Sequence, residues 1–154
     1  NKSYKNYQGG NPFGSQAKML LHMDRLWEYL QTGDTTPIFM EISPTNKCNL
    51  KCAWCISENA RGSQEIEINA LENFFKDFSE IGGKAITFSG GGEPTYYPHF
   101  DRAVKSAKKT GLELGLMTHG IYPDKYTNLI GENFQWARFS LDTLDENNYK
   151  KWKS

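Results

Sequence analysis

Four short apolar runs, each followed by polar residues and then by a helical pattern, constrain the fold of this chain more than any other feature. The runs span residues 38–42, 85–88, 112–117 and 136–141. Repeated strand and helix units of this kind imply a parallel sheet with right-handed crossovers. The sequence therefore predicts an α/β fold, with about four β/α units in these residues.

Helical patterns fill the intervals between the apolar runs. Residues 67–81 place apolar side chains on one face, and the pattern ends at Gly82-Gly83, a common helix terminator. Residues 100–109, 126–130 and 146–153 are predicted as further helices.

An amphipathic helix is also predicted before the first strand, over residues 16–31. Its apolar positions recur at helical spacing and are predicted to pack in a core: Met19, Leu20, Met23, Leu26, Trp27 and Leu30. Residues 1–15 are rich in Asn, Gly, Ser and Tyr without periodicity and are predicted as a loop or arm. Two parts follow: residues 1–33, an arm and an amphipathic helix, and residues 34–154, the main domain.

All three cysteines of the chain lie within one stretch of eight residues. Cys48, Cys52 and Cys55 are separated by three and two residues, which lets the thiolates of one loop converge on a single centre, as in iron-sulfur and zinc sites. Three thiolates do not close a tetrahedral zinc site. On a four-iron cubane they leave one iron without a protein ligand, and that iron would be the reactive one.

Two other uses of the cysteines stay open at this point. A disulfide would leave one thiol over, and no signal peptide or further cysteine indicates an oxidising framework. A structural zinc needs a fourth ligand, which folding would have to bring from His22, His99 or His119.

Composition excludes some function classes. The chain has 154 residues, of which 38% are hydrophobic and 23% charged, as in an ordinary globular domain. Eighteen basic residues balance eighteen acidic ones, so nothing indicates the basic footprint of a duplex-binding protein. No apolar run approaches the ~20 residues of a membrane span. We expect a cytoplasmic protein, and the start at Asn1 rather than Met predicts a segment of a longer chain.

Polar and small residues follow each of the four predicted strands. The first strand leads into 43–45 and the cysteine loop, and the second into 89–95. The third ends in Thr118-His119-Gly120 and the fourth in Ser140-Leu141-Asp142. These clusters all lie at carboxyl ends of parallel strands, the edge where α/β folds place their active sites.

The glycine run 90–92 offers a backbone that a ligand can approach closely. Consecutive glycines reach positive φ without side-chain obstruction, so their amides and carbonyls are open to small charged groups. A tight strand-to-helix turn explains the same residues.

These motifs together resemble the radical S-adenosylmethionine (radical SAM) enzymes. The family signature is C-x3-C-x2-C with an aromatic residue before the last cysteine, where this chain has Trp54, and Gly91-Gly92-Glu93 matches the family's GGE motif. The resemblance implies a partial TIM-like (β/α)6 barrel, of which this chain would be the amino-terminal part. Two more strands would then follow, and these residues alone would not be a complete enzyme.

The resemblance also implies roles for individual residues. Cys48, Cys52 and Cys55 would hold a 4Fe-4S cluster, Trp54 would pack near the adenine of S-adenosylmethionine, and the backbone of Gly91, Gly92 and Glu93 would bind its methionyl amino group. Polar residues at the ends of the third and fourth strands would reach the methionyl carboxylate and the ribose: Thr118, Ser140 and Asp142. His119 is a candidate proton donor or an ordinary loop histidine.

The chemistry implied by the resemblance is reductive cleavage of S-adenosylmethionine. It yields methionine and a 5′-deoxyadenosyl radical, which abstracts hydrogen from a substrate, and it needs a one-electron donor such as flavodoxin or ferredoxin. The stretch before the cysteines is similar to family members that modify peptides or small metabolites. A non-catalytic iron-sulfur module for electron transfer or structure is the alternative. It explains the thiolates but not the glycine motif.

Overall fold

The structure, a computed structural model, describes residues 20–57 and 62–153. The described residues divide after Thr36 into two compact units. The first contains α1 (Met23–Thr32), which ends at Gly33 in a left-handed conformation with φ 76°. None of the ten residues of α1 is buried, and the predicted core packing of its apolar stripe stays a prediction. The predicted arm 1–15 and the first residues of the predicted helix lie outside the described residues.

The second unit contains a sheet of parallel strands in the order β1-β2-β3-β4 among the described residues. The strands are β1 (Phe39–Ile42), β2 (Ala85–Phe88), β3 (Glu113–Thr118) and β4 (Trp136–Phe139). Each strand pairs with the next one along the chain, and all pairs are parallel. The predicted α/β fold with four β/α units is confirmed.

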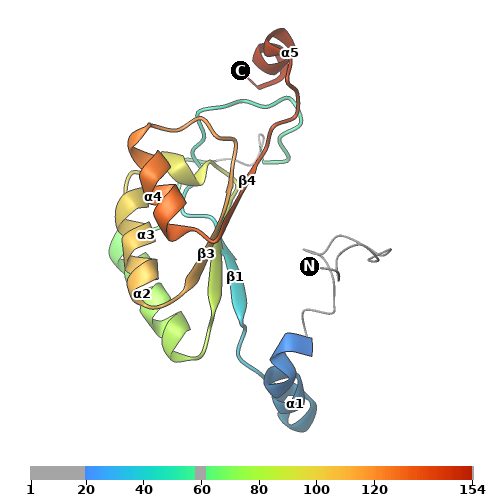
Figure 1. The fold of residues 1–154 in the computed structure, drawn as a ribbon, viewed down its shortest axis with the longest axis vertical. Coiled ribbons are helices and arrows are strands. Elements are labelled where there is room, and N and C mark those ends of the chain that lie inside the picture. Colours follow the sequence, from blue (N-terminus) through green and yellow to red (C-terminus); the bar gives the residue numbers. More distant parts are fainter. Residues whose placement is uncertain (1–19, 58–61, 154) are drawn as a thin grey trace, which may run out of the picture. The chain divides into compact units, whose positions relative to one another are not determined.

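Three helices cover one face of this sheet: α2 (Ile68–Glu80), α3 (Phe100–Lys109) and α4 (Lys125–Asn133) (Figure 1). The register aligns Ile42, Phe88 and Leu116 in one row, and all three are buried in the core. The ring of Phe88 lies about 6 Å from those of Phe75 on α2 and Phe100 on α3. This aromatic packing fixes the strand ends relative to the helices.

The opposite face of the sheet is less apolar. Glu41, Thr87, Gly115 and Trp136 form one row of the register. A side chain at Gly115 would collide with the indole of Trp136 and approach the hydroxyl of Thr87. Glycine therefore lets the indole lie directly against the strand backbone.

The elements at the carboxyl ends of the strands surround the cysteine loop. The short 3-10 helix η2 (Pro94–Tyr96) follows β2, and α5 (Glu146–Lys153) follows β4 at the same end of the sheet (Figure 1). Among the described residues, no helix is both long and apolar enough to cross a membrane.

Candidate functional site

The cysteine loop is closed at its base by a short antiparallel contact. Thr45 forms an isolated bridge with Glu65, and the N–H of Asn46 donates to the carbonyl of Gln64 at 2.9 Å. The ammonium of Lys47 lies 3.0 Å from the carboxylate of Glu65. These contacts fix the point where the chain leaves β1 and enters the loop.

The three cysteines are partly buried, and no disulfide links them. The N–H of Cys55 donates to the carbonyl of Cys52 at 3.0 Å, and the N–H of Leu50 donates to the sulfur of Cys48 at 3.4 Å. Burial raises the pKa of the Cys52 thiol, and the nearby Lys153 ammonium opposes this rise. Among the described residues, no three His, Cys, Asp or Glu side chains are arranged to hold a metal ion. The thiols share one loop, but they are not gathered on one point.

The glycine turn after β2 packs directly on the start of the cysteine loop. Gly90 has φ 148°, a conformation that side chains disfavour, and a Cβ there would strike Ser43. The N–H of Gly91 donates to the hydroxyl of Ser43 at 3.0 Å. A Cβ at Gly92 would collide with the carbonyl oxygen of Lys47. Glycine is therefore required here for close contact between two backbones.

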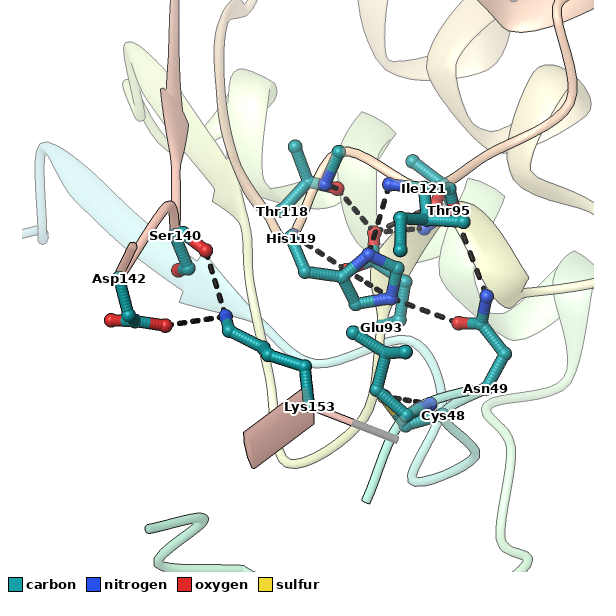
Figure 2. A network of polar contacts seen from close by, with 12 residues as sticks. Cys48, Asn49, Glu93, Thr95, Thr118, His119, Ile121, Ser140, Asp142 and Lys153 are labelled. Atoms are coloured by element: carbon teal, nitrogen blue, oxygen red, sulfur yellow. Dashed lines mark hydrogen bonds and ion pairs between the residues drawn. The ribbon is translucent and has the colours of Figure 1, made fainter. Parts of the chain in front are cut away.

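Glu93 is buried, with 3% of its surface exposed, and its carboxylate is enclosed by donors (Figure 2). One carboxylate oxygen accepts from the N–H and the hydroxyl of Thr95 at 3.1 and 2.6 Å, and from the hydroxyl of Thr118 at 2.7 Å. The other accepts from the N–H of His119 at 3.0 Å. This set of donors compensates the burial of a charge.

The ring of His119 links the end of β3 to the cysteine loop (Figure 2). Its Nε2 lies 2.8 Å from Oδ1 of Asn49 and 3.3 Å from the carboxylate of Glu93, and its Nδ1 accepts from the N–H of Ile121 at 3.0 Å. Burial lowers the pKa of His119. The Glu93 carboxylate acts against this effect, and Lys153 adds to it. A neutral imidazole fits these surroundings.

The end of β4 is organised by Lys153, which is 3% exposed. Its ammonium donates to the carbonyl of Ser140 at 2.7 Å and lies 2.5 Å from the carboxylate of Asp142 (Figure 2). Two polar groups at the end of the fourth strand are thus already engaged by the last turn of α5.

The indole of Trp54 lies beside the same turn of α5. Its centroid is 6.2 Å from that of Trp152, and the N–H of Ala53 donates to the carbonyl of Trp152 at 2.9 Å. Trp54 keeps 49% of its surface exposed, so its ring remains accessible beside the cysteines.

The structure brings the predicted residues into two groups. Glu93 and Thr118 bond to each other, and Ser140 and Asp142 share Lys153. The sequence interpretation left three residues out of the site: Asn49, Thr95 and Lys153. Asn49 connects the first group to the loop through His119, and Lys153 lies near Cys52 of the loop. Thr95 donates to Glu93 within the first group. Asn49 could have been predicted as a site residue from the sequence, because it follows Cys48 directly. Lys153 gave no signal, since lysines in a terminal basic helix are usually solvated.

Comparison with known proteins identifies the family. The Radical SAM superfamily model matches residues 42–153. The chain belongs to the radical SAM superfamily. It is 28% identical over 137 residues to a GTP 3′,8-cyclase of Chlorobaculum tepidum, covering 86% of this chain and 39% of the cyclase.

Other relatives carry different names. The tungsten-containing aldehyde ferredoxin oxidoreductase cofactor-modifying protein of Pyrococcus furiosus is 33% identical over 114 residues, which cover 70% of this chain and 31% of that protein. The crystal structure of Streptococcus suis SuiB bound to S-adenosylmethionine superposes with a TM-score of 0.70 at 18% identity, covering 96% of this chain and 35% of SuiB. The chain thus spans between about a third and two fifths of the length of these radical SAM relatives.

Proposed function

We propose that this chain carries the S-adenosylmethionine-cleaving site of a radical SAM enzyme. The observation that carries the proposal is the contact between the cysteine loop and the glycine turn. The N–H of Glu93 donates to the carbonyl of Lys47 at 2.9 Å, and Gly92 leaves no room for a side chain between them. A thiolate loop and an open backbone turn are thereby held side by side at the carboxyl end of the sheet, where α/β folds place their active sites.

The donor set fits an iron-sulfur cluster. Cys48, Cys52 and Cys55 are three thiols on one loop, the ligand type such clusters require. Burial raises the pKa of the Cys52 thiol, and the nearby Lys153 ammonium reduces this rise. When bound by these thiolates, a 4Fe-4S cluster would pass one electron from an external donor to the sulfonium of S-adenosylmethionine, breaking the bond to the ribose 5′ carbon and releasing methionine and a 5′-deoxyadenosyl radical.

The chain's own residues would bind and orient S-adenosylmethionine. We assign the methionyl amino group to the backbone of Gly91, Gly92 and Glu93, because the Glu93 carboxylate is already occupied by internal donors. Trp54 offers an exposed aromatic face for the adenine. Thr118 serves this site by holding Glu93.

Ser140 and Asp142 are proposed to act toward the ribose and the methionyl carboxylate. The Lys153 ammonium, which binds the Ser140 carbonyl and the Asp142 carboxylate, holds both residues in place at this end of β4.

The partners are a one-electron donor, such as flavodoxin or ferredoxin, and a peptide or small-molecule substrate. SuiB, which shares the fold, has a crystal structure in which it is bound to precursor peptide SuiA, and this supports the peptide alternative. The reduced thiols of the site suit a cytoplasmic location.

The test is anaerobic reconstitution of the complete protein with iron and sulfide, followed by addition of S-adenosylmethionine and a chemical reductant. We expect about one four-iron cluster per chain, with broad visible absorption, and release of 5′-deoxyadenosine. Cys55→Ala should remove the absorption. A full cluster in this variant would contradict the ligand assignment.

A second measurement separates the enzyme from a non-catalytic iron-sulfur module. S-adenosylmethionine should change the spectrum of the cluster and bind stoichiometrically. Gly91→Val should weaken this binding without loss of the cluster, because a β-branched residue restricts the turn. If the spectrum of the cluster does not change when S-adenosylmethionine is added, the result would favour the electron-transfer module.

A further inference from the structure

Both neighbours of Cys48 are tied to one buried residue, Glu93. On one side, the carbonyl of Lys47 accepts from the N–H of Glu93 at 2.9 Å. On the other side, the side-chain amide of Asn49 bonds to the ring of His119, and the backbone N–H of His119 donates to the Glu93 carboxylate at 3.0 Å. Contacts on both sides of the first cysteine of the loop thus converge on the ends of β2 and β3. Figure 2 shows the contact on the Asn49 side.

The hydrogen bonds of the His119 ring define its tautomer. Nδ1 accepts from the N–H of Ile121 at 3.0 Å, so it carries a lone pair and no proton. In the neutral ring the proton is therefore on Nε2. That atom lies 2.8 Å from Oδ1 of Asn49, and Nε2–H donates to this oxygen.

The orientation of the Asn49 amide follows from the same argument. Its Oδ1 accepts from His119, and its Nδ2 faces the carbonyl of Ile121 at 3.5 Å. Donor and acceptor are complementary at both ends only in this orientation. The Asn49 side chain thus binds the turn 119–121 in one orientation only, and its shorter contact is the hydrogen bond to His119.

We propose that His119 is a positioning residue that holds the cysteine loop through Nε2–H and Asn49 and thereby sets the place of Cys48. The inference rests on the proposed function, because it assigns Cys48 as a cluster ligand. Neither His119 nor Asn49 contacts the reacting atoms in this role. Glu93 supports it by fixing the backbone of His119.

The test measures how fast a chelator removes iron from the reconstituted, complete protein. His119→Ala should release iron about fivefold faster, the factor expected for the loss of one hydrogen bond. His119→Gln should largely restore the slow rate, because its amide N–H reaches the position of Nε2. The matched control is His99→Ala, since His99 is exposed and makes no capping bond through its side chain.

Two results distinguish the positioning role of His119 from a merely structural one: rescue by His119→Gln and coupling between His119 and Asn49. Asn49→Ala should accelerate iron release as much as His119→Ala, and the double variant should add little to either. Equal rates in the unmodified protein and His119→Ala, no rescue by Gln, or additive effects of the two substitutions would each overturn the proposal.

The tautomer of His119 can be measured in the unmodified protein, without any substitution. Nitrogen-15 NMR of the His119 ring should show a neutral imidazole protonated at Nε2 in the unmodified protein at neutral pH. A proton on Nδ1, or a charged ring, would overturn the proposal even if His119→Ala fails to fold. Failure of the unmodified protein to bind any cluster would instead contradict the proposed function, and the NMR result would still decide the hydrogen bond.

Discussion

The buried carboxylate of Glu93 is the residue on which most contacts of the site depend. It replaces hydration with several protein donors, including the hydroxyls of Thr95 and Thr118. Removing one such donor costs more than an average hydrogen bond, because the acceptor is charged and buried. The resemblance to the family pointed to Glu93 as a ligand-binding residue. The structure adds that its side chain has an internal role.

Thr118→Val tests this internal role. The substitution keeps the shape of the side chain but removes the hydroxyl that donates to Glu93, so we expect a loss of about 1 to 3 kcal/mol in the free energy of unfolding. Chemical denaturation followed by circular dichroism measures it. Thr127→Val, at an exposed position in α4, is the matched control and should change little. A neutral result at Thr118 would mean that water replaces the hydroxyl.

His119 predicts how stability depends on pH. Burial lowers its pKa below the ordinary 6.5, despite the opposing effect of Glu93, so the unfolded chain binds a proton more readily than the folded one. Its contribution is therefore unchanged above pH 6.5 and is lost as pH falls through 6.5 toward the folded pKa. The free energy of unfolding should fall from pH 7.5 to 5.5 by less in His119→Gln than in the unmodified protein. His99→Gln is the control and should keep the full loss.

At the scale of elements, the glycine turn and the cysteine loop pack directly against each other. Gly92→Ala should force them apart, because its Cβ would meet the backbone carbonyls of Thr45 and Lys47 and not a flexible side chain. We expect destabilisation together with weaker binding of S-adenosylmethionine. Gly131→Ala is the matched control, since nothing lies near its Cβ, and in the last turn of α4 it should gain at most ~1 kcal/mol. Equal effects at the two positions would contradict the close contact.

The sequence predicted the elements better than the contacts between them. β2 and α3 have the predicted bounds, because apolar periodicity and flanking glycine or charge mark both ends. β4 ends at Phe139, before the predicted end at residue 141, since the carbonyl of Ser140 is taken by Lys153. α4 is longer than predicted, and η2 was not predicted. Its start is set by the Glu93 carboxylate, which accepts from the N–H of Thr95.

In the candidate site too, the sequence predicted the segments better than the contacts between them. The spacing of the cysteines and the glycine run marked the two backbone segments, because those patterns are local. The link between Asn49 and His119 joins residues 70 positions apart. Periodicity carries no information about such a pair, and only the fold brings the ends of β1 and β3 together.

At the scale of the whole molecule, the described sheet has two outer strands, β1 and β4. Apolar side chains remain exposed around β4: Trp136, Phe139 and Leu141. An unpaired strand edge beside apolar surface promotes pairing between chains. The matched relatives are more than twice as long as the aligned region, and a longer chain offers further segments to cover this edge.

We therefore expect residues 1–154, prepared alone, to self-associate at micromolar concentration. Leu141→Lys should shift sedimentation profiles toward the monomer, because it places a charge at the end of the β4 edge. Ile56→Lys, at a fully exposed position of the cysteine loop, adds the same charge elsewhere and should have little effect. A cooperatively folded monomer at this concentration would contradict the expected self-association.

The indole of Trp136 against Gly115 has a consequence for how such sequences diverge. Any side chain at position 115 would need the volume that the indole occupies, so the two positions cannot vary independently. Across an alignment of relatives, a larger residue at 115 should appear together with a smaller one at 136. Such covariation would show that the sheet face opposite the helices has kept this packing while the sequences diverged.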